Sequence, residues 1–408
     1  MKAIRLRTEH LQNPIGVDFT SPRLFWNCEG GKRQTAYQIV AADDSGSVLW
    51  DSGRVESAAM RAQWGGKPVP PKTKVLWKVR LWDETDTSGD WADASFETGM
   101  DAWKAKWITG NYPVNKKERY PVDCFRKAFH AADVKKARLY ITACGLYEAK
   151  LNGQRIGDFI LAPGITDYRK RVQYQTYDVT GLLQNGENAL TVQLADGWYR
   201  GSCGAWGLKN QYGTETKLLA QLELTRADGS VQTVATDESW AWSNDGAIRF
   251  ADNKDGEIVD AQKEPTYSGK AKVTSHPVTP SASNNVPVAE HERLKAKRIT
   301  TPSGKTVLDF GQNIAGYAEF TVTAHAGEKI KLRFGELLDE NGEFTQKNIQ
   351  CANKHITTPL QQVIYTCKEG ENHYKTTFAI FGFQYVLVET DVAFQPEDFT
   401  AIAVYSDM

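Results

Sequence analysis

The sequence predicts an all-β protein built from three consecutive antiparallel β-sandwich domains. Apolar and polar residues alternate over many short runs, such as 137–151 and 188–194, and a period of two is typical of strands with one buried face. Turn residues, among them Asn152-Gly153, separate these runs. No helical periodicity extends beyond about three turns. We therefore expect only short helical turns, for example directly after Asp178.

Residues 1–100 predict a small sandwich of the fibronectin-III or immunoglobulin-like type. Turn signals recur at a spacing of about ten residues, which suits such domains. In the run KVLWKVRLWD, Trp77, Val79 and Leu81 share one face. Six of the twelve tryptophans fall in this segment, and we expect them to pack its core rather than bind a sugar.

Residues 101–276 predict a second, jelly-roll-like sandwich. Asn152-Gly153 predicts a hairpin, because a type I′ turn needs positive φ at both central residues. The alternating run that begins at Asn188 ends in the loop ADGWYRG (195–201), which is rich in aromatic residues and glycine. Residues 277–297 contain three prolines and no periodicity, and they predict a linker.

Residues 298–395 predict the third sandwich. Alternate positions between Ala318 and Ala324, and again between Ile330 and Phe334, are apolar. This segment has no tryptophan, so we expect its core to consist of Phe, Tyr, Ile and Leu. We expect residues 396–408 to begin a connection to a further domain that this sequence lacks.

Composition argues against several classes of partner. The chain has 49 Lys and Arg against 50 Asp and Glu, a formal net charge of -1, which favours neither a nucleic-acid groove nor an anionic membrane surface. No apolar run approaches the ~18 residues of a membrane helix. The N-terminus has no apolar signal-peptide core. The compartment stays open between the cytoplasm and a processed secreted or periplasmic form.

Metal, redox and nucleotide motifs are not found in the sequence. The six cysteines form no CxxC pair, and we expect reduced thiols. The seven histidines show no metal or triad spacing. Acidic clusters at Glu336, Asp339 and Glu340, and at Asp252 and Asp255, are expected to be solvated turn residues. A calcium site among such turns is the alternative, without assigned ligands.

The candidate site for carbohydrate binding is the glycine-rich segment that follows the second alternating run. Sugars stack their apolar face on aromatic rings, while Asn, Asp or Arg side chains bind the hydroxyls. The predicted binding residues are Trp198, Tyr199, Arg200 and Trp206, with Tyr168 and Tyr174 as flanking rings. The structural alternative is that Trp198 closes the end of the sandwich.

Several phrases closely resemble bacterial α-L-rhamnosidases of the glycoside hydrolase family 78 type. YEAKLNGQRIGD, LAPGITDYRK, LADGWYRG and GEIVDAQKE resemble their N-terminal module, which is similar to galactose-binding-like jelly rolls. PRLFWN and WKVRLWD resemble the first domain of these enzymes. DFGQN, GELLDENG and FGFQYV resemble the concanavalin-like sandwich that precedes the catalytic domain.

The resemblance implies a function for the parent protein. That family hydrolyses terminal α-L-rhamnosides with inversion, through carboxylates in an (α/α)6 barrel that are held ~6.5–9.5 Å apart. This sequence has no helical pattern for such a barrel, so the resemblance implies a non-catalytic front part that is inactive alone and carries no catalytic residue. The implied partners are a rhamnose-containing glycan or glycoside and the parent's catalytic barrel.

Two alternatives from other classes remain at this point. One is a free-standing carbohydrate-binding protein, and the other is a structural or interaction module. No cofactor is required under any of these hypotheses. Calcium remains an option, because some rhamnosidases carry a sandwich module that binds rhamnose through calcium.

Overall fold

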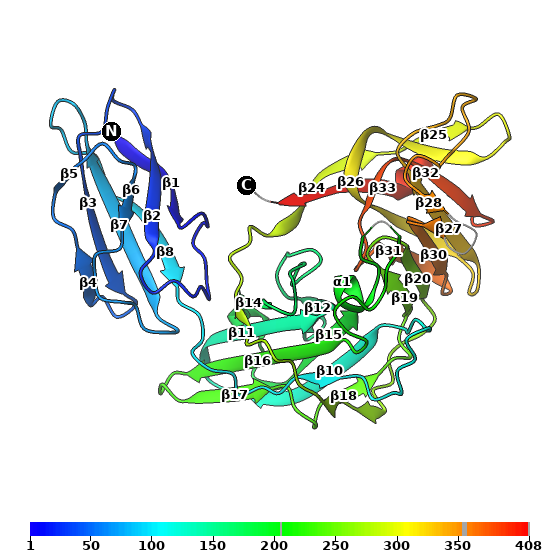
Figure 1. Ribbon diagram of the computed structural model, residues 1–408, viewed down its shortest axis with the longest axis horizontal. Helices are drawn as coiled ribbons and strands as arrows, with labels where there is room; N and C mark the ends of the chain where they lie inside the picture. The colour runs from blue at the N-terminus through cyan, green and yellow to red at the C-terminus, as the bar shows by residue number, and fades with distance from the viewer. Residues whose placement is uncertain (205, 353–356, 407–408) are drawn as a thin grey trace. The chain divides into compact units, whose positions relative to one another are not determined.

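The computed structural model describes residues 1–204, 206–352 and 357–406 (Figure 1). The all-β prediction is confirmed, since the helical elements of this part of the chain are α1 (Gly197–Arg200) and two 3-10 turns, Thr180–Leu182 and Pro396–Asp398. The first of these turns follows Asp178, as expected. None of the described helices has the length and apolar character needed to cross a membrane.

The chain divides into two compact units. The first contains residues 1–104 and the two short segments Tyr174–Tyr177 and Ser281–Asn285. The second unit contains the remaining described residues, and with them the second and third predicted sandwiches.

The first unit is a sandwich of two antiparallel sheets. One has the order β1-β2-β6, and the other has the order β4-β3-β7-β8 with β5 beside β3. The tryptophans at positions 26, 64 and 77 are buried between the sheets, as predicted. The strands are β1 (Lys2–Thr8), β2 (Arg23–Glu29), β3 (Ala36–Asp43), β4 (Val48–Asp51), β5 (Val55–Glu56), β6 (Arg61–Gln63), β7 (Lys74–Trp82) and β8 (Ala92–Glu97).

The second sandwich packs a sheet of order β13-β12-β15-β10-β18-β21 against a sheet that runs β22-β9-β16-β11, with β17 beside β16. The predicted hairpin is present, because Asn152 has a φ of 53° and Leu151 pairs with Gln154. The strands of this sandwich are β9 (Ile108–Thr109), β10 (Asp123–Ala131), β11 (Val134–Cys144), β12 (Leu146–Leu151), β13 (Gln154–Arg155), β15 (Gly186–Ala195), β16 (Lys217–Arg226), β17 (Val231–Ala235), β18 (Ala241–Ser243), β21 (Gly269–Lys270) and β22 (Lys272–Val273). Two further strands, β14 (Gln173–Asp178) and β23 (Ser281–Ala282), fall mostly in the two short segments assigned to the first unit.

The third sandwich is built on a sheet of order β19-β20-β30-β27-β32-β26-β33-β24, with β25 and β31 also paired to β26. Its core consists of Phe, Tyr and aliphatic side chains, as expected. The strands are β19 (Ile248–Asp252), β20 (Gly256–Asp260), β24 (Val288–Lys295), β25 (Lys297–Thr300), β26 (Thr306–Ala324), β27 (Lys329–Gly335), β30 (Gln362–Thr366), β31 (Gly370–Tyr374), β32 (Phe381–Thr390) and β33 (Phe399–Ser406), and a separate pair is formed by β28 (Cys351–Ala352) and β29 (Thr357–Thr358).

Three segments pair differently from the expected boundaries. The hairpin β19-β20, placed by sequence in the second domain, pairs in parallel with β30 of the third. Residues 288–295 of the expected linker form β24, and residues 399–406 of the expected connection form β33, its antiparallel partner. One buried cluster also joins Leu146 and Ala195 of the second sandwich to the third sandwich. The second and third sandwiches therefore share a core.

Candidate functional site

The ADGWYRG loop contains a tight turn at the end of β15. Gly197 has a φ of 52°, which residues with a side chain rarely adopt. A Cβ atom there would also lie only 2.7 Å from Cγ of Leu146, so both backbone conformation and close packing favour glycine at this position. The turn continues into α1, which places Asp196 and Arg200 one helical turn apart. Nε of Arg200 donates to Oδ1 of Asp196 at 2.6 Å, and both side chains are buried. The loop thus forms a buried ion pair.

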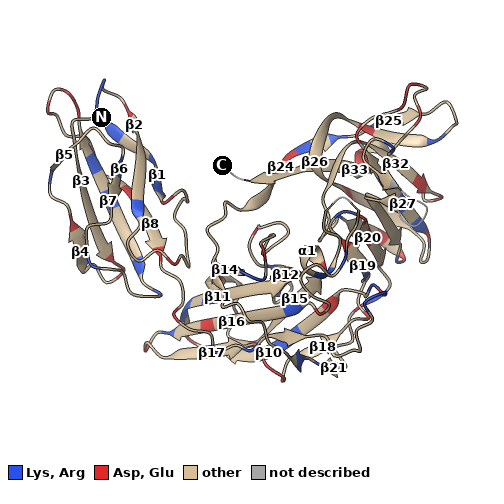
Figure 2. Ribbon diagram, viewed as in Figure 1, with Lys and Arg blue, Asp and Glu red and all other residues tan. Residues whose placement is uncertain are grey.

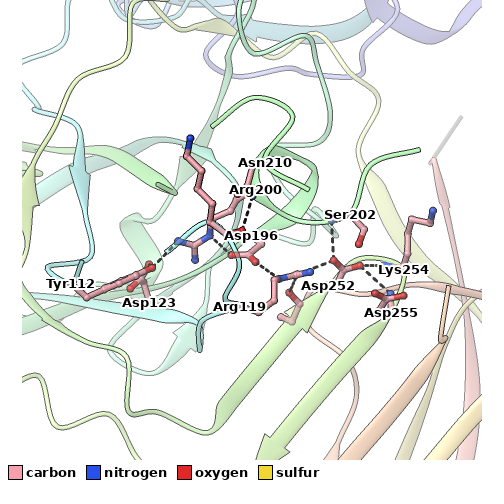
Figure 3. A network of polar contacts seen from close by, with 12 residues as sticks. Tyr112, Arg119, Asp123, Asp196, Arg200, Ser202, Asn210, Asp252, Lys254 and Asp255 are labelled. Atoms are coloured by element: carbon pink, nitrogen blue, oxygen red, sulfur yellow. Dashed lines mark hydrogen bonds and ion pairs between the residues drawn. The ribbon is translucent and has the colours of Figure 1, made fainter. Parts of the chain in front are cut away.

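Arg119 connects this loop to the third sandwich (Figure 3). Its Nε donates to Asp196 at 2.9 Å, and its second guanidinium nitrogen Nη2 donates to Asp252 at 2.8 Å. The backbone N–H groups of Ser202 and Lys254 also donate to Asp252. Burial alone would raise the pKa of Asp252, but the Arg119 charge and hydrogen bonds from the N–H groups of Asp255 and Lys254 keep it below its ordinary value.

The structure corrects the prediction for Asp252. It is 1% exposed and ion-paired, rather than a solvated turn residue. Its neighbour Asp255 also has a structural role, since one carboxylate oxygen accepts hydrogen bonds from the Thr358 hydroxyl at 2.8 Å and from the Leu360 N–H at 3.0 Å. These contacts join the β19-β20 turn to the strand region around β29.

A third carboxylate, that of Asp123, lies at the other end of the network. Arg200 donates to the Tyr112 hydroxyl at 2.7 Å, and that hydroxyl donates to Asp123 at 3.4 Å. Asp123 also accepts from the Trp242 indole at 2.9 Å and from the Thr216 hydroxyl at 3.1 Å. Burial raises the pKa of Asp123 to about 6. Its side chain is fully enclosed, so it cannot contact a substrate as a general acid must.

Three buried polar atoms border this network without a hydrogen-bond partner among the described residues: Nη1 of Arg119, Oγ of Ser202 and Oδ1 of Asn253. Arg119 and Ser202 both donate to Asp252, and Asn253 follows Asp252 in the chain. Buried polar atoms are satisfied in most folded proteins. This part of the network therefore retains hydrogen-bonding capacity that the packing does not use.

The predicted binding residues of the loop point mainly into the protein. Tyr199 and Arg200 are 3% and 5% exposed. The Tyr199 ring contacts the edge of the Tyr168 ring at 5.2 Å between centroids. Trp198 is partly buried and packs against the cluster of buried residues that the second and third sandwiches share. A sugar-binding role for these three side chains remains a prediction.

Trp206 lies differently, because it is exposed. Its side chain is 54% exposed, and that of the nearby Leu208 is 53% exposed. The Cys203 N–H donates a hydrogen bond to the Leu208 carbonyl at 2.9 Å. Tyr174 belongs to the first unit, where its ring contacts the Trp103 ring at 5.5 Å between centroids, and its expected role beside the loop stays a prediction. Trp206 is therefore the predicted residue best placed to meet a sugar.

Sequence reasoning missed Arg119 and Tyr212. Arg119 contacts carboxylates 77 and 133 residues away, and no local spacing indicates such pairs. Tyr212 is partly buried and contacts the Tyr168 ring at 5.1 Å, which extends the aromatic cluster. Aromatic residues downstream of the WYRG phrase were the available signal for it.

The network as a whole has the chemistry of a structural ion-pair cluster. Asp196 and Asp252 are both buried and ion-paired with guanidinium groups, which hold the two carboxylates in fixed positions. Within the described residues, no group of three or more His, Cys, Asp and Glu side chains could hold a metal ion. The fold and this cluster define a multidomain β-sandwich protein with a buried, ion-paired junction between its second and third sandwiches.

Comparison with known proteins identifies the sandwiches individually. Residues 3–102 match the Rha78A-like N-terminal immunoglobulin domain, residues 132–301 match the α-L-rhamnosidase N-terminal domain, and residues 299–405 match the bacterial α-L-rhamnosidase concanavalin-like domain. An α-L-rhamnosidase of Formosa agariphila is 32% identical over 93% of this chain and 44% of its own length. One of Streptomyces avermitilis is 28% identical over 95% of the chain and 56% of its own length.

Solved structures agree with these matches. The α-L-rhamnosidase of Aspergillus terreus has a TM-score of 0.92 at 31% identity, and it covers 100% of this chain and 49% of its own. The Streptomyces avermitilis enzyme complexed with L-rhamnose has a TM-score of 0.89 at 26% identity, over 100% of this chain and 57% of its own.

The chain therefore belongs to the α-L-rhamnosidase family and corresponds to the N-terminal domains of these proteins. It spans about half the length of the curated relatives it matches. Its described residues form β-sandwiches and include no (α/α)6 barrel.

Proposed function

We propose that this chain is the non-catalytic N-terminal portion of an α-L-rhamnosidase-like glycoside hydrolase, whose parent reaction is inverting hydrolysis of terminal α-L-rhamnosides. The observation that carries the proposal is that the buried carboxylates are ion-paired or enclosed by protein. Asp196 and Asp252 are held by Arg119 and Arg200, and Asp123 is enclosed. An inverting glycosidase needs an acid and a base that both reach the substrate. The network supports a scaffold role instead.

We further propose that the Cys203–Leu208 loop contributes carbohydrate binding. Among the residues that the structure describes, Trp206 is the tryptophan with an exposed side chain, and an exposed indole offers an apolar face to a sugar ring. The same feature favours the second candidate function, a free-standing carbohydrate-binding protein. Rhamnose-containing glycans or glycosides are the proposed ligands, because the relatives are named α-L-rhamnosidases.

Calorimetric titration of the purified chain with L-rhamnose tests this proposal, with calcium and again with a chelator. We expect weak binding that Trp206→Ala removes and that the matched control Leu208→Ala retains. Loss of binding on chelation would assign the site to calcium. Absence of rhamnose binding in both conditions would refute the binding role and leave a structural or interaction module.

A further inference from the structure

The outer face of the three-stranded sheet in the first sandwich carries a row of basic and aromatic side chains. Arg7 of β1 lies directly opposite Phe25 of β2, and Phe25 lies directly opposite Arg61 of β6. Residues opposite one another on adjacent antiparallel strands project to the same side of the sheet. The three side chains therefore form one row, with the phenyl ring between two guanidinium groups.

A bulge adds a third arginine to this face. Pairing in β1 shifts between Ile4 and Arg7, so that two residues of β1 oppose one residue of β2. Arg5, inside the bulge, has a φ of 50° and an exposed side chain. Bulges reorient side chains in this way. Arg5 and Arg7 together line an open hollow of about 670 Å³, whose other lining residues include Phe25, Asn27, Met60 and Arg61.

The arginines of this hollow lack counter-charges. Among the described residues, the side chains of Arg5, Arg7 and Arg61 make no hydrogen bond and no ion pair. The acidic residue of the hollow, Glu9, is bound by the Arg23 guanidinium. Residues 1–104 hold as many Asp and Glu as Lys and Arg, so the basic face does not reflect a basic domain (Figure 2). Clustered like charges disfavour folding.

We propose that this face, formed by Arg5, Arg7, Phe25 and Arg61, binds a polysaccharide that carries carboxylate or sulfate groups. Adjacent strands are ~4.8 Å apart, so Arg7 and Arg61 stand roughly 10 Å apart across the phenyl ring. The Arg23 guanidinium, which is paired with Glu9, lies over the Phe25 ring at 5.7 Å from its centroid, so the sugar would lie beside this ring, between Arg7 and Arg61. Arginine binds carboxylate and sulfate-type anions through two parallel N–H donors.

The charge of the ligand and its carbohydrate nature follow from different features of this face. The negative charge of the ligand follows from the unpaired arginines. The choice of a carbohydrate rests on the proposed function and on the ring between the charges. Asn27 and Met60 extend the face with an amide and an exposed apolar side chain.

Affinity electrophoresis of the 408-residue chain tests the proposal with three polymers: sodium polygalacturonate for carboxylate, dextran sulfate for sulfate, and dextran as the neutral control. We expect retardation by at least one polyanion and none by dextran. Raising the salt concentration should weaken the retardation. Retardation by one polymer alone shows whether the face prefers carboxylate or sulfate. Retardation by both shows that it accepts both anions.

The double variant Arg7→Gln/Arg61→Gln should weaken binding roughly tenfold or more, since two charge-assisted contacts are lost. The matched control is Arg33→Gln, which removes an exposed arginine of the same sandwich outside the hollow. Three results would overturn the proposal: no retardation by either polyanion, equal losses in the control, or equally tight binding of polyglutamate or duplex DNA. Rhamnose titration is scored separately, so failure of the two proposals is distinguishable.

Discussion

Gly256 brings two strands of the third sandwich closer than any other residue type would allow. It has a φ of 106°, and a Cβ atom there would lie 1.8 Å from the carbonyl oxygen of Gln362, its parallel partner in β30. The pairing of β20 with β30 therefore depends on this glycine. The neighbouring Glu257 extends from the same strand into the core, where it accepts from the Tyr374 hydroxyl and from the Thr377 N–H.

Gly256→Ala should destabilise the second unit by more than about 3 kcal/mol, because the clash involves backbone on both sides. Gly304→Ala is the matched control. Gly304 also has a positive φ but open space around it, so its substitution should cost only about 1–2 kcal/mol. Urea denaturation followed by tryptophan fluorescence measures both. Equal effects would show that close approach at Gly256 is unimportant.

Glu257 should make stability depend on pH. Burial raises its pKa to about 7 from an ordinary value of 4.5. A carboxyl whose folded pKa is raised stabilises fully below the unfolded pKa, and this contribution is lost as pH rises through the folded pKa. The free energy of unfolding should therefore fall by up to about 3 kcal/mol between pH 4.5 and 7 from this group.

Glu257→Gln should remove this fall of the unfolding free energy with pH. The substitution can also lower stability by an amount that is the same at every pH. The measurement is the difference in unfolding free energy between the variant and the wild type across pH 4.5–8. Substitution of the exposed Glu340 by Gln should leave the slope intact. A pH-independent difference for Glu257→Gln would contradict the assignment of the titration to this carboxyl.

The burial of individual residues was predictable where the local alternation of apolar and polar residues decides it. Trp77, Val79 and Leu81 are 1%, 0% and 0% exposed, as period-two alternation indicates. Asp252 was not predictable, because its burial depends on Arg119, which lies far away in the sequence. Tyr199 and Arg200 turn inward because α1 follows the tight turn at Gly197, and composition suggested an exposed loop.

At the scale of elements, local pairs were predictable and distant pairs were not. The Asn152-Gly153 hairpin needs only neighbouring residues, and it forms as expected. The β19-β20 hairpin was also recognisable as a local phrase, but its parallel partner β30 lies far along the chain. Residues 288–295 contain a proline-flanked polar run that reads as a linker, and they become a strand because β33 provides its partner.

Arg119→Met tests the junction between the second and third sandwiches. Removing the guanidinium leaves Asp252 without its counter-charge in a buried site, while Asp196 keeps only Arg200, and this loss typically costs about 3–5 kcal/mol. Arg169→Met is the control, since the Arg169–Asp167 pair is largely exposed and contributes at most about 1 kcal/mol. Chemical denaturation should separate the two variants clearly. Similar small losses would mean that the network does not hold the junction.

At the scale of the molecule, the two compact units should unfold in two calorimetric transitions. Trp77 is buried in the first unit and Phe334 in the second. Truncation of either side chain to Ala should cost about 3–5 kcal/mol and lower one transition only, a different one in each variant. A single transition that both variants lower equally would contradict the division into units.

The central claim is that this chain is the non-catalytic part of a rhamnosidase-like protein. The most direct test is hydrolysis of p-nitrophenyl α-L-rhamnopyranoside by the purified 408-residue chain, with Asp123→Asn and buffer as controls. The account predicts no release of p-nitrophenol above the buffer rate at any pH from 4 to 8. Turnover that co-purifies with the chain and is lost in Asp123→Asn would contradict it, because a buried carboxylate would then have catalytic access.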